Sequence, residues 1–267
     1  MPEIDTTVEI QARRTIKEFL DRRGLGTFRK RAYLVSYPRS GNTLLREYFS
    51  ILQGRPQLSV YEGDIVNSAS AALTQALDHV EIVKSHQMPV GDGAMIYLVR
   101  DGRNATLSFL YMAFLFGGHQ YSEVTEVYDG LRHLDKAEAC WADHVAQAFR
   151  QSETRQTLFV RYEDLICTPE VALAQMAHFL NAEVSVEVFG ECVRRQKASD
   201  HYAKNPYNGY LYEPSKNSIY DILKRHRRDD YWRYIFDDRS RRYFHECGGT
   251  RWLLHFDYER SADWWKE

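Results

Sequence analysis

The sequence predicts an α/β protein, a single domain in which a central parallel sheet is flanked by helices. Short segments rich in β-branched and aromatic residues alternate with segments whose apolar residues recur at helical spacing. Strands separated by helices favour βαβ units and a sheet that is covered on both faces. The 267-residue chain contains no repeat and no linker rich in proline and glycine, so we expect residues 1–267 to form one domain.

The individual elements follow from these patterns. Strands are expected at residues 32–37, 81–86, 95–100 and 157–162. Helices are expected at residues 43–53, 102–116, 133–151 and 168–180, after an N-terminal helical segment at residues 1–30. Asp101 is suited to cap the helix that begins at residue 102. Thr168 and Pro169 are typical of a helix start, as N-cap and first helical residue.

Composition limits the functions to be considered. The formal net charge is -2, so no global field attracts nucleic acid or an anionic membrane, and any anion site must be local. The longest apolar run, residues 109–116, is shorter than the roughly 18 residues that span a bilayer, and no signal-peptide-like stretch opens the chain. Four cysteines far apart in sequence indicate reduced thiols: Cys140, Cys167, Cys192 and Cys247. We therefore expect a cytoplasmic protein without a nucleic-acid or membrane partner.

A strand-turn-helix pattern at residues 38–43 carries the first chemical signal. Backbone N–H groups at the start of a helix bind anions, and a glycine lets a phosphate approach the chain closely. The residues available for this are Arg39, Ser40, Gly41, Asn42 and Thr43. The GxxxxGK(S/T) frame of the common nucleotide-binding loop is missing. The pattern predicts a P-loop-like anion site, although a structural turn rich in small residues would have a similar sequence.

Lys84 and His86 stand at the end of the second predicted strand. Residues two apart in a strand point to the same face of the sheet. A histidine, with a pKa near 6.5, is suited to act as a general base at neutral pH. Because the chain contains 10 histidines, His86 taken alone is more simply explained as a structural or exposed residue. Its place beside the predicted anion loop makes it a candidate base.

Arg100 and Ser108 are candidates for a second phosphate site. Arg100 ends a predicted strand, and Ser108 lies about two turns into the helix that follows. A guanidinium group and a hydroxyl group at these positions could hold one phosphate between them. The simpler alternatives are a surface position for Arg103, in the same turn, and a core-edge position for Ser108.

These three motifs follow three different predicted strands. Residues 38–43, 84–86 and 100–103 each stand at or just beyond a strand end. Ligands of parallel α/β sheets bind beyond the carboxyl ends of the strands. The sequence therefore predicts one shared site that holds an anion.

Four segments together resemble the cytosolic-type sulfotransferase family. These enzymes use 3'-phosphoadenosine 5'-phosphosulfate (PAPS) and release adenosine 3',5'-bisphosphate (PAP). The segments are YPRSGNTLL (37–45), IVKSH (82–86), YLVRDGRNATLSFLY (97–111) and VRYEDL (160–165). They follow one another in the family's order and rough spacing across residues 32–180. The resemblance implies a single α/β domain with PAPS across the strand ends, and transfer of its sulfuryl group to a hydroxyl or amine with no metal required.

The resemblance also implies roles for individual residues. The loop from Arg39 to Thr43 would hold the 5'-phosphosulfate, with arginine where many members carry lysine. Arg100 and Ser108 would bind the 3'-phosphate. His86 would be the general base of an in-line displacement, while Lys84 and Arg39 would neutralise charge on the leaving phosphate. Tyr162 would contact the adenine, with a buried strand-end aromatic as the alternative.

Two segments depart from the family's pattern. Many members have a tryptophan after the final threonine of the loop, where it stacks on adenine, whereas this chain has Leu44. The family's C-terminal loop, usually of the type RKGxxGxW, corresponds to RHRRDDYWR at residues 225–233, which lacks both glycines. Arg225 and Arg227 are therefore candidate 3'-phosphate ligands, with a solvated basic run as the alternative.

The acceptor pocket is expected in loops over the strand ends, at residues 60–68, 116–130 and 200–215. Residues 200–215 are rich in tyrosine and glycine, which is typical of a mobile substrate lid. The loops carry acidic residues with few cations nearby: Glu62, Asp64, Glu123, Glu126 and Asp129. They favour a small-molecule acceptor that is neutral or cationic over a polyanionic glycan. A homodimer is compatible with the sequence.

Other functions stay open on the sequence alone. A kinase-like phosphoryl transferase on a related fold would bind Mg·ATP, which the missing Walker lysine disfavours. A non-catalytic protein that binds PAPS or PAP would share the phosphate motifs, but it would give no reason for Lys84 and His86. A purely structural interaction protein would leave both phosphate motifs unexplained.

Overall fold

The computed structural model describes residues 30–61, 64–67, 71–116, 124–137, 140–198 and 231–266. The predicted N-terminal helical segment lies outside the described residues, except for Lys30, which begins the first strand instead of ending a helix. The predicted lid at residues 200–215 lies wholly outside them.

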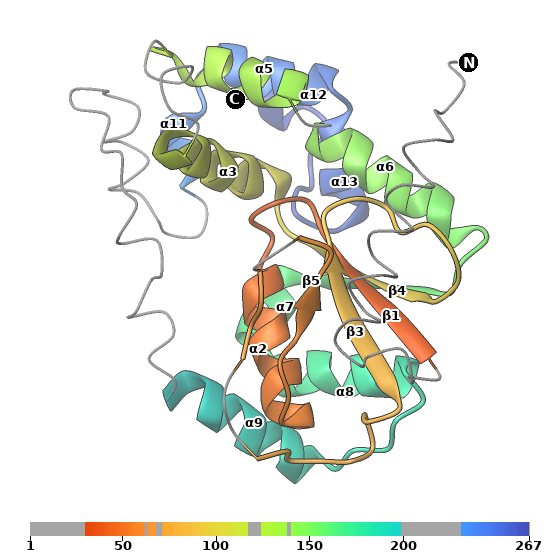
Figure 1. Ribbon diagram of the computed structural model, residues 1–267. Helices are drawn as coiled ribbons and strands as arrows, with labels where there is room; N and C mark the ends of the chain where they lie inside the picture. Colours follow the sequence, from red (N-terminus) through yellow and green to blue (C-terminus); the bar gives the residue numbers. More distant parts are fainter. Residues whose placement is uncertain are drawn as a thin grey trace.

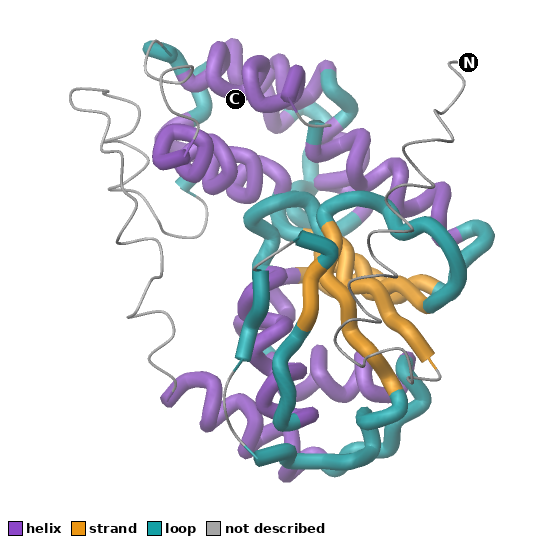
Figure 2. Tube along the Cα trace, in the orientation of Figure 1, coloured by secondary structure: helices purple, strands orange, loops and turns teal. Residues whose placement is uncertain are grey.

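Five parallel strands form one sheet in the order β2-β3-β1-β4-β5 within the described residues. The strands are β1 (Lys30–Val35), β2 (Leu58–Ser59), β3 (Val80–Ser85), β4 (Ala94–Val99) and β5 (Thr157–Arg161). β1 is central, because it pairs with β3 on one side and with β4 on the other. Figures 1 and 2 show the sheet between two groups of helices, so the predicted α/β class and parallel sheet are confirmed.

Successive side chains of the central strands enter two different cores. In β1, Tyr33 and Val35 join one buried apolar cluster, whereas Ala32 and Leu34 join the other. β4 divides its side chains in the same way, with Tyr97 in the first cluster. A strand that is buried on both faces needs an unbroken apolar run, which is what these strands have.

Four helices cover the face to which Ala32 and Leu34 belong. They are α2 (Asn42–Gln53), α7 (Tyr162–Cys167), α8 (Pro169–Phe179) and α9 (Val186–Ala198). α2 follows β1 directly and places Leu44, Leu45 and Phe49 in this cluster. The start of α2 is therefore fixed against the sheet close to the end of β1.

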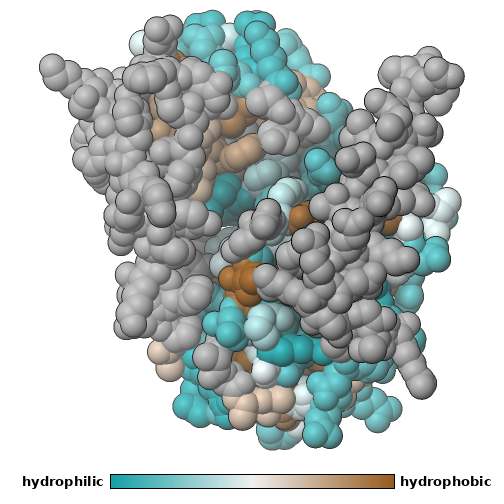
Figure 3. Space-filling view, in the orientation of Figure 1, coloured by the Kyte–Doolittle hydropathy of each residue, from teal (hydrophilic) through white to brown (hydrophobic). Residues whose placement is uncertain are grey.

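The opposite face is covered by a second group of helices. They are α3 (Gly102–Phe116), α5 (Val127–Ala137), α6 (Trp141–Ser152), α11 (Trp232–Ile235), α12 (Asp238–Glu246), α13 (Gly249–His255) and the 3-10 helix η2 (Trp264–Lys266). Aromatic rings dominate the core beneath them, and Trp141 stacks on Phe244 with ring centroids 5.6 Å apart. α5 and α12, at the top of Figures 1 and 3, present hydrophilic side chains outward.

The predicted helix at residues 133–151 is wrong, because the chain forms two helices there. α5 ends at Ala137, and α6 begins at Trp141. Cys140 has an extended backbone with ψ of 157°, and its Sγ accepts a hydrogen bond from the N–H of Asp143 at 3.5 Å. Cys140 is thus an N-cap, which starts a new helix. The sequence analysis also gave no sign of β2, α9 or the helices after residue 230.

The other predicted elements are confirmed with small shifts at their ends. Pro169 is the first residue of α8 and Thr168 precedes it, but the Thr168 hydroxyl donates to the Asp164 carbonyl rather than capping the helix. Asp101 does cap α3, since its Oδ1 accepts from the backbone N–H of Arg103 at 2.9 Å. Among the helices described, none has both the length and the apolar character needed to cross a bilayer.

Arg103 is a buried structural residue, and the surface position considered for it is wrong. Its side chain is 1% exposed and donates to Asp101 Oδ2 at 2.7 Å. The same guanidinium donates to Glu259 Oε2 at 2.8 Å and lies 3.7 Å from the centroid of the Trp232 ring. Arg103 therefore ties the start of α3 to the C-terminal part of the chain.

Replacing Arg103 by methionine (Arg103→Met) should destabilise the fold strongly. Asp101 and Glu259 would lose their shared cation, and breaking a buried ion pair costs about 3–5 kcal/mol of unfolding free energy. Urea denaturation followed by circular dichroism measures this loss. The control is Arg251→Met, at an exposed arginine that rests on Trp252. It should cost less than about 1 kcal/mol. An equal, small cost for both variants would contradict the structural role of Arg103.

Candidate active site at the strand ends

Three neighbouring strands bring the predicted motifs to one edge of the sheet. β1, β3 and β4 are parallel and adjacent, so their carboxyl ends lie together. The loop at residues 36–41 follows β1, His86 follows β3, and Arg100 follows β4. The strand order also reverses here, because β3 lies on one side of β1 and β4 on the other. Open α/β sheets bind ligands at such a switch point.

The loop after β1 has the backbone geometry of an anion site. Arg39 has a φ of 67° and Gly41 a φ of 96°, and both lie in the left-handed region. A positive φ at a residue other than glycine is strained, and such residues are often found at functional sites. Gly41 is also the N-cap of α2, and no described side chain hydrogen-bonds the helix N-terminus as a cap. The first N–H groups of α2 are therefore available to an anion.

The buried side chains of Ser40 and Asn42 lie on the inner side of this loop. Ser40 Oγ is fully buried and, within the part of the chain that the structure describes, has no hydrogen-bond partner. A buried hydroxyl without a partner is costly, and a ligand atom can satisfy it. Asn42 instead donates from Nδ2 to Ser36 Oγ at 3.0 Å, so its side chain stiffens the loop. Thr43 is exposed at the start of α2.

Tyr162 packs directly against the loop. A Cβ atom on residue 41 would lie 2.3 Å from Tyr162 Cδ2, so only glycine fits at that position. The guanidinium group of Arg100 lies over the same ring, 4.7 Å from its centroid. Tyr162 is the first residue of α7 rather than the last of a strand. Its ring therefore links the first loop to the third motif.

Arg39, Arg100 and Ser108 meet in one cluster. Arg39 Nε donates to Ser108 Oγ at 3.3 Å, and Arg100 Nη1 donates to the carbonyl oxygen of Arg39 at 3.0 Å. The helix residue Ser108 thus comes to the loop after β1, although the two are 69 positions apart in the sequence. The structure joins the residues predicted for the two phosphate sites into one continuous polar surface.

His86 is fixed in the tautomer that a general base needs. Its Nδ1 lies 2.9 Å from the carbonyl oxygen of Ser36. A carbonyl only accepts hydrogen bonds, so Nδ1 carries the proton and Nε2 keeps its lone pair. The backbone N–H of His86 donates to Tyr61 Oη at 3.2 Å, which holds the residue from the other side.

Burial lowers the pKa of His86 to about 4, and the positive charge of Lys84 acts in the same direction. Both effects disfavour the imidazolium ion. The ring is therefore neutral at physiological pH, and its Nε2 is ready to accept a proton.

His144 holds the backbone of His86, and the sequence analysis missed it. His144 Nε2 donates to the carbonyl oxygen of His86 at 2.6 Å, and Tyr97 Oη donates to His144 Nδ1 at 2.7 Å. Both residues are buried. Nothing in the sequence distinguishes His144 from the other histidines, because its partners come from β4 and from the end of β3.

Asp64 is an ion-pair partner of Lys84, which corrects the prediction made for the acidic loops. Lys84 Nζ donates to Asp64 Oδ2 at 2.7 Å, and Arg46 Nη1 donates to Asp64 Oδ1 at 2.8 Å. Glu126 also forms an ion pair, with Arg239. Two of the five acidic residues therefore do have cations nearby. Glu62 and Glu123 lie outside the described residues.

The other residues considered for the site either lie outside the described residues or are buried in the core. Arg225 and Arg227 lie outside the described residues. Leu44 is buried in the core beneath α2, so the loop supplies no aromatic ring at that position. Trp232, from the segment compared with the family's C-terminal loop, is buried beneath Arg103.

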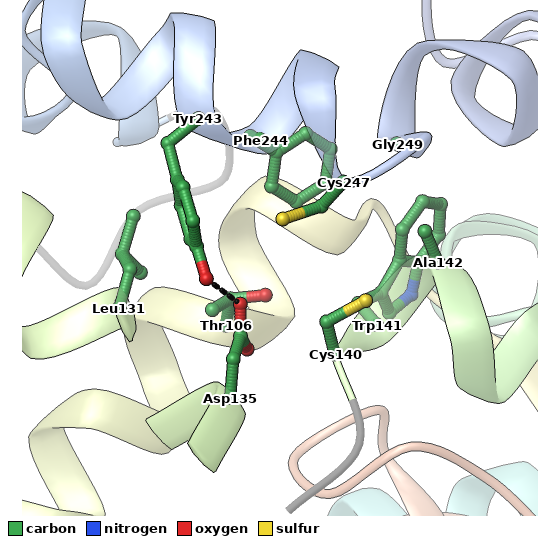
Figure 4. Close-up of a pocket in the computed structure, with 10 residues that line it drawn as sticks. All are labelled: Thr106, Leu131, Asp135, Cys140, Trp141, Ala142, Tyr243, Phe244, Cys247 and Gly249. Carbon is green, nitrogen blue, oxygen red and sulfur yellow. Dashed lines mark hydrogen bonds between the residues drawn. The ribbon is translucent and has the colours of Figure 1, made fainter. Parts of the chain in front are cut away.

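A small cavity between α3, α5, α6, α12 and α13 contains none of the predicted site residues (Figure 4). Cys140 and Cys247 both line it, although they are far apart in the sequence. The neighbouring Cys140 thiol lowers the pKa of Cys247. Tyr243 Oη donates to Asp135 Oδ2 at 2.8 Å, and burial raises the pKa of Asp135 to about 6. All four cysteines are free thiols.

No group of three or more histidine, cysteine, aspartate or glutamate side chains among the described residues is placed to hold a metal ion.

Comparisons with known proteins find relatives in sequence and structures of similar fold. Mouse Sulfotransferase 1B1 is 21% identical over 206 residues, which cover 68% of each chain. The structure of mouse sulfotransferase SULT7A1 complexed with PAP has a TM-score of 0.55 at 18% identity and covers 85% of both chains. A retinol dehydratase in complex with androsterone and PAP has a TM-score of 0.57 at 18% identity, covering 87% of this chain and 83% of that one. These structures have the same fold.

The family model described as the Sulfotransferase domain matches residues 29–261, which is most of the chain. It spans all five strands, every motif of the strand-end site and the helices α11, α12 and α13. The chain therefore belongs to the sulfotransferase family.

Proposed function

We propose that the protein transfers the sulfuryl group of PAPS to a hydroxyl or amine of a small molecule and releases PAP. Membership of the sulfotransferase family supports sulfuryl transfer as the activity, and the related structures that contain PAP support PAPS as the donor. One observation carries the residue roles. The anion loop, Ser108, Arg100 and a neutral histidine meet at one sheet edge.

The residues present fit a ligand with two anionic ends. Arg39, the buried Ser40 hydroxyl and the N–H groups of Gly41, Asn42 and Thr43 would hold the 5'-phosphosulfate. The uncapped start of α2 and the unpartnered Ser40 Oγ support this. Arg100 and Ser108 would hold the 3'-phosphate, with Arg225 and Arg227 as further candidates. Tyr162, beneath Arg100, would contact the adenine.

The reaction we propose is an in-line displacement. PAPS supplies an activated sulfuryl group on a good leaving phosphate. The acceptor oxygen or nitrogen forms a bond to sulfur while the bridging bond to the 5'-phosphate breaks, and His86 Nε2 takes the acceptor's proton. Arg39 and Lys84 stabilise the negative charge that grows on the phosphate. Preorganised charges of this kind are commonly the largest catalytic contribution.

We propose a small-molecule acceptor. The retinol dehydratase of similar fold was solved with androsterone, which is a small neutral molecule. The ion pairs of Asp64 and Glu126 weaken the argument for a cationic acceptor, because both carboxylates already have a cation. We therefore favour a neutral acceptor. We also propose that the enzyme is cytoplasmic, in line with the cytosolic-type motifs. We propose in addition that a single domain extends along the whole chain.

The donor site is tested first by thermal melting with PAP, AMP and Mg·ATP. A ligand at about 100 times its dissociation constant adds about 2.7 kcal/mol of stability, which is roughly 5–10 °C for a domain of this size. We expect that rise with PAP and a much smaller one with AMP. Arg100→Met should weaken PAP binding by about tenfold to a hundredfold, whereas Arg132→Met, at an exposed arginine of α5, should not. A rise with Mg·ATP alone would favour the kinase-like alternative.

His86→Ala should abolish most turnover but preserve donor binding. Removing a general base typically costs about 10²–10⁴ in rate. Sulfate transfer to a panel of phenols, alcohols and amines gives the rate, and the PAP-induced rise in melting temperature reports the donor site. His178→Ala is the matched control, because His178 is exposed on α8. Undiminished turnover of His86→Ala would remove His86 from its role. An inactive wild type that binds PAP would favour the non-catalytic alternative.

The pKa of His86 predicts an unusually acid-tolerant enzyme. The pKa falls from an ordinary value of 6.5 to about 4, so Nε2 stays unprotonated well below neutral pH. We expect kcat/KM to be constant down to about pH 5, with its acid limb below that. The free energy of unfolding also decreases as the pH falls, because the unfolded state binds more protons than the folded state. The contribution of His86 is full above pH 6.5 and is lost as pH falls toward 4. An acid limb centred near 6.5 would contradict the assignment.

A further inference from the structure

Asp64 bridges two cations that belong to different parts of the site. Its Oδ2 accepts from Lys84 Nζ at 2.7 Å, and its Oδ1 accepts from Arg46 Nη1 at 2.8 Å. The side chain of Arg46 is completely buried, and that of Lys84 is 13% exposed. These are short, charge-assisted contacts between two largely buried cations and a carboxylate that is 32% exposed.

Arg46 fixes Asp64 in position. Its Nη2 donates to the backbone carbonyls of Asp64 at 2.8 Å and of Gln57 at 3.1 Å, in addition to the contact with the carboxylate. One buried guanidinium therefore holds both the main chain and the side chain of Asp64. Arg46 lies in α2, about one turn after the Gly41 N-cap. Asp64 is thus anchored to the same helix that opens with the anion loop.

Burial and two neighbouring arginines disfavour the positive charge of Lys84. Burial lowers its pKa most, and the charges of Arg46 and Arg39 lower it further. The charged, titratable and aromatic groups that face it come from α2, the loop after β1, the segment after β2 and the end of β3: Arg46, Arg39, Asp64, Tyr61 and His86. Asp64 is the group whose hydrogen bond and charge raise the pKa of Lys84.

We propose that Asp64 is a positioning residue for sulfuryl transfer, which acts by holding the Lys84 ammonium group beside His86 and keeping it charged. The proposal rests on the proposed function, in which Lys84 stabilises negative charge on the leaving phosphate. Asp64 itself is not a catalytic residue, because a carboxylate in direct contact with a phosphate would repel it. Its effect passes through Lys84.

The pH dependence of anion binding distinguishes this role from a merely structural one. In Asp64→Asn, the Lys84 ammonium group keeps its two cationic neighbours but loses its carboxylate, so it deprotonates at lower pH. Each unit of pKa corresponds to a tenfold change in the protonation equilibrium. Once Lys84 of Asp64→Asn begins to lose its proton, we expect the PAP dissociation constant to rise by up to about tenfold per pH unit, and this rise should begin at a lower pH than in the wild type.

Three further variants test whether the charge of Asp64 acts through Lys84. Asp64→Glu keeps the charge and should restore the wild-type pH dependence of PAP binding. Asp64→Asn combined with Lys84→Met should abolish the extra pH dependence, because the titrating group is gone. Asp92→Asn, at an exposed aspartate that precedes β4, should behave as wild type. If Asp64→Asn does not fold, Asp64→Ser removes the charge while keeping an oxygen for Arg46.

The outcomes separate this inference from the proposed function. Wild-type protein that fails to bind PAP at any pH would contradict the proposed function itself. Wild-type protein that binds PAP, together with an Asp64→Asn variant of identical pH dependence, would overturn the role of Asp64 and leave the proposed function standing. An extra pH dependence that persists without Lys84 would also overturn it, because another group would then be titrating.

Discussion

The site depends on one constraint, the parallel pairing of β1 with β3 on one side and with β4 on the other. Parallel neighbours place their carboxyl ends at the same edge, whatever the loops that follow contain. The anion loop, the histidine and Arg100 therefore meet in space although they are far apart in the sequence. The two cores keep this pairing in register, because a slip of one residue would exchange the side chains of Val35 and Leu34 between them.

Four of the described arginines near this edge differ in the contacts that the structure gives for them. Arg46 and Arg103 are buried and bonded to carboxylates, so their charges are satisfied within the fold. The described contacts of Arg39 and Arg100 include a hydroxyl, a carbonyl and an aromatic ring. An anionic ligand can supplement neutral contacts of this kind. The local sequence does not reveal the difference, because the deciding carboxylates, Asp64 and Glu259, are distant in the chain.

The predictable part of the protein is the part that local patterns specify. The strand runs, Pro169 at a helix start and the loop around Gly41 are all short-range signals, and the structure contains each of them. The helix start at Cys140 was missed because residues 133–151 were interpreted as one helix, whereas Cys140 has an extended backbone and caps α6. The contact of His144 with the end of β3 joins residues that are 58 positions apart, which no local pattern records.

The acidic loop shows how charge can mislead when partners are unknown. The sequence alone predicts that Asp64 is an unpaired carboxylate near the acceptor. In the structure it lies between the two cations Arg46 and Lys84. Three positive side chains gather at this corner, since Arg39 and Arg46 both act on the charge of Lys84. Arg46 and Lys84 are largely buried, so their mutual repulsion would be costly without a fixed negative charge. One anchored carboxylate offsets it. The sheet edge can therefore concentrate enough positive charge to attract a polyanionic donor while the lysine remains an ammonium ion.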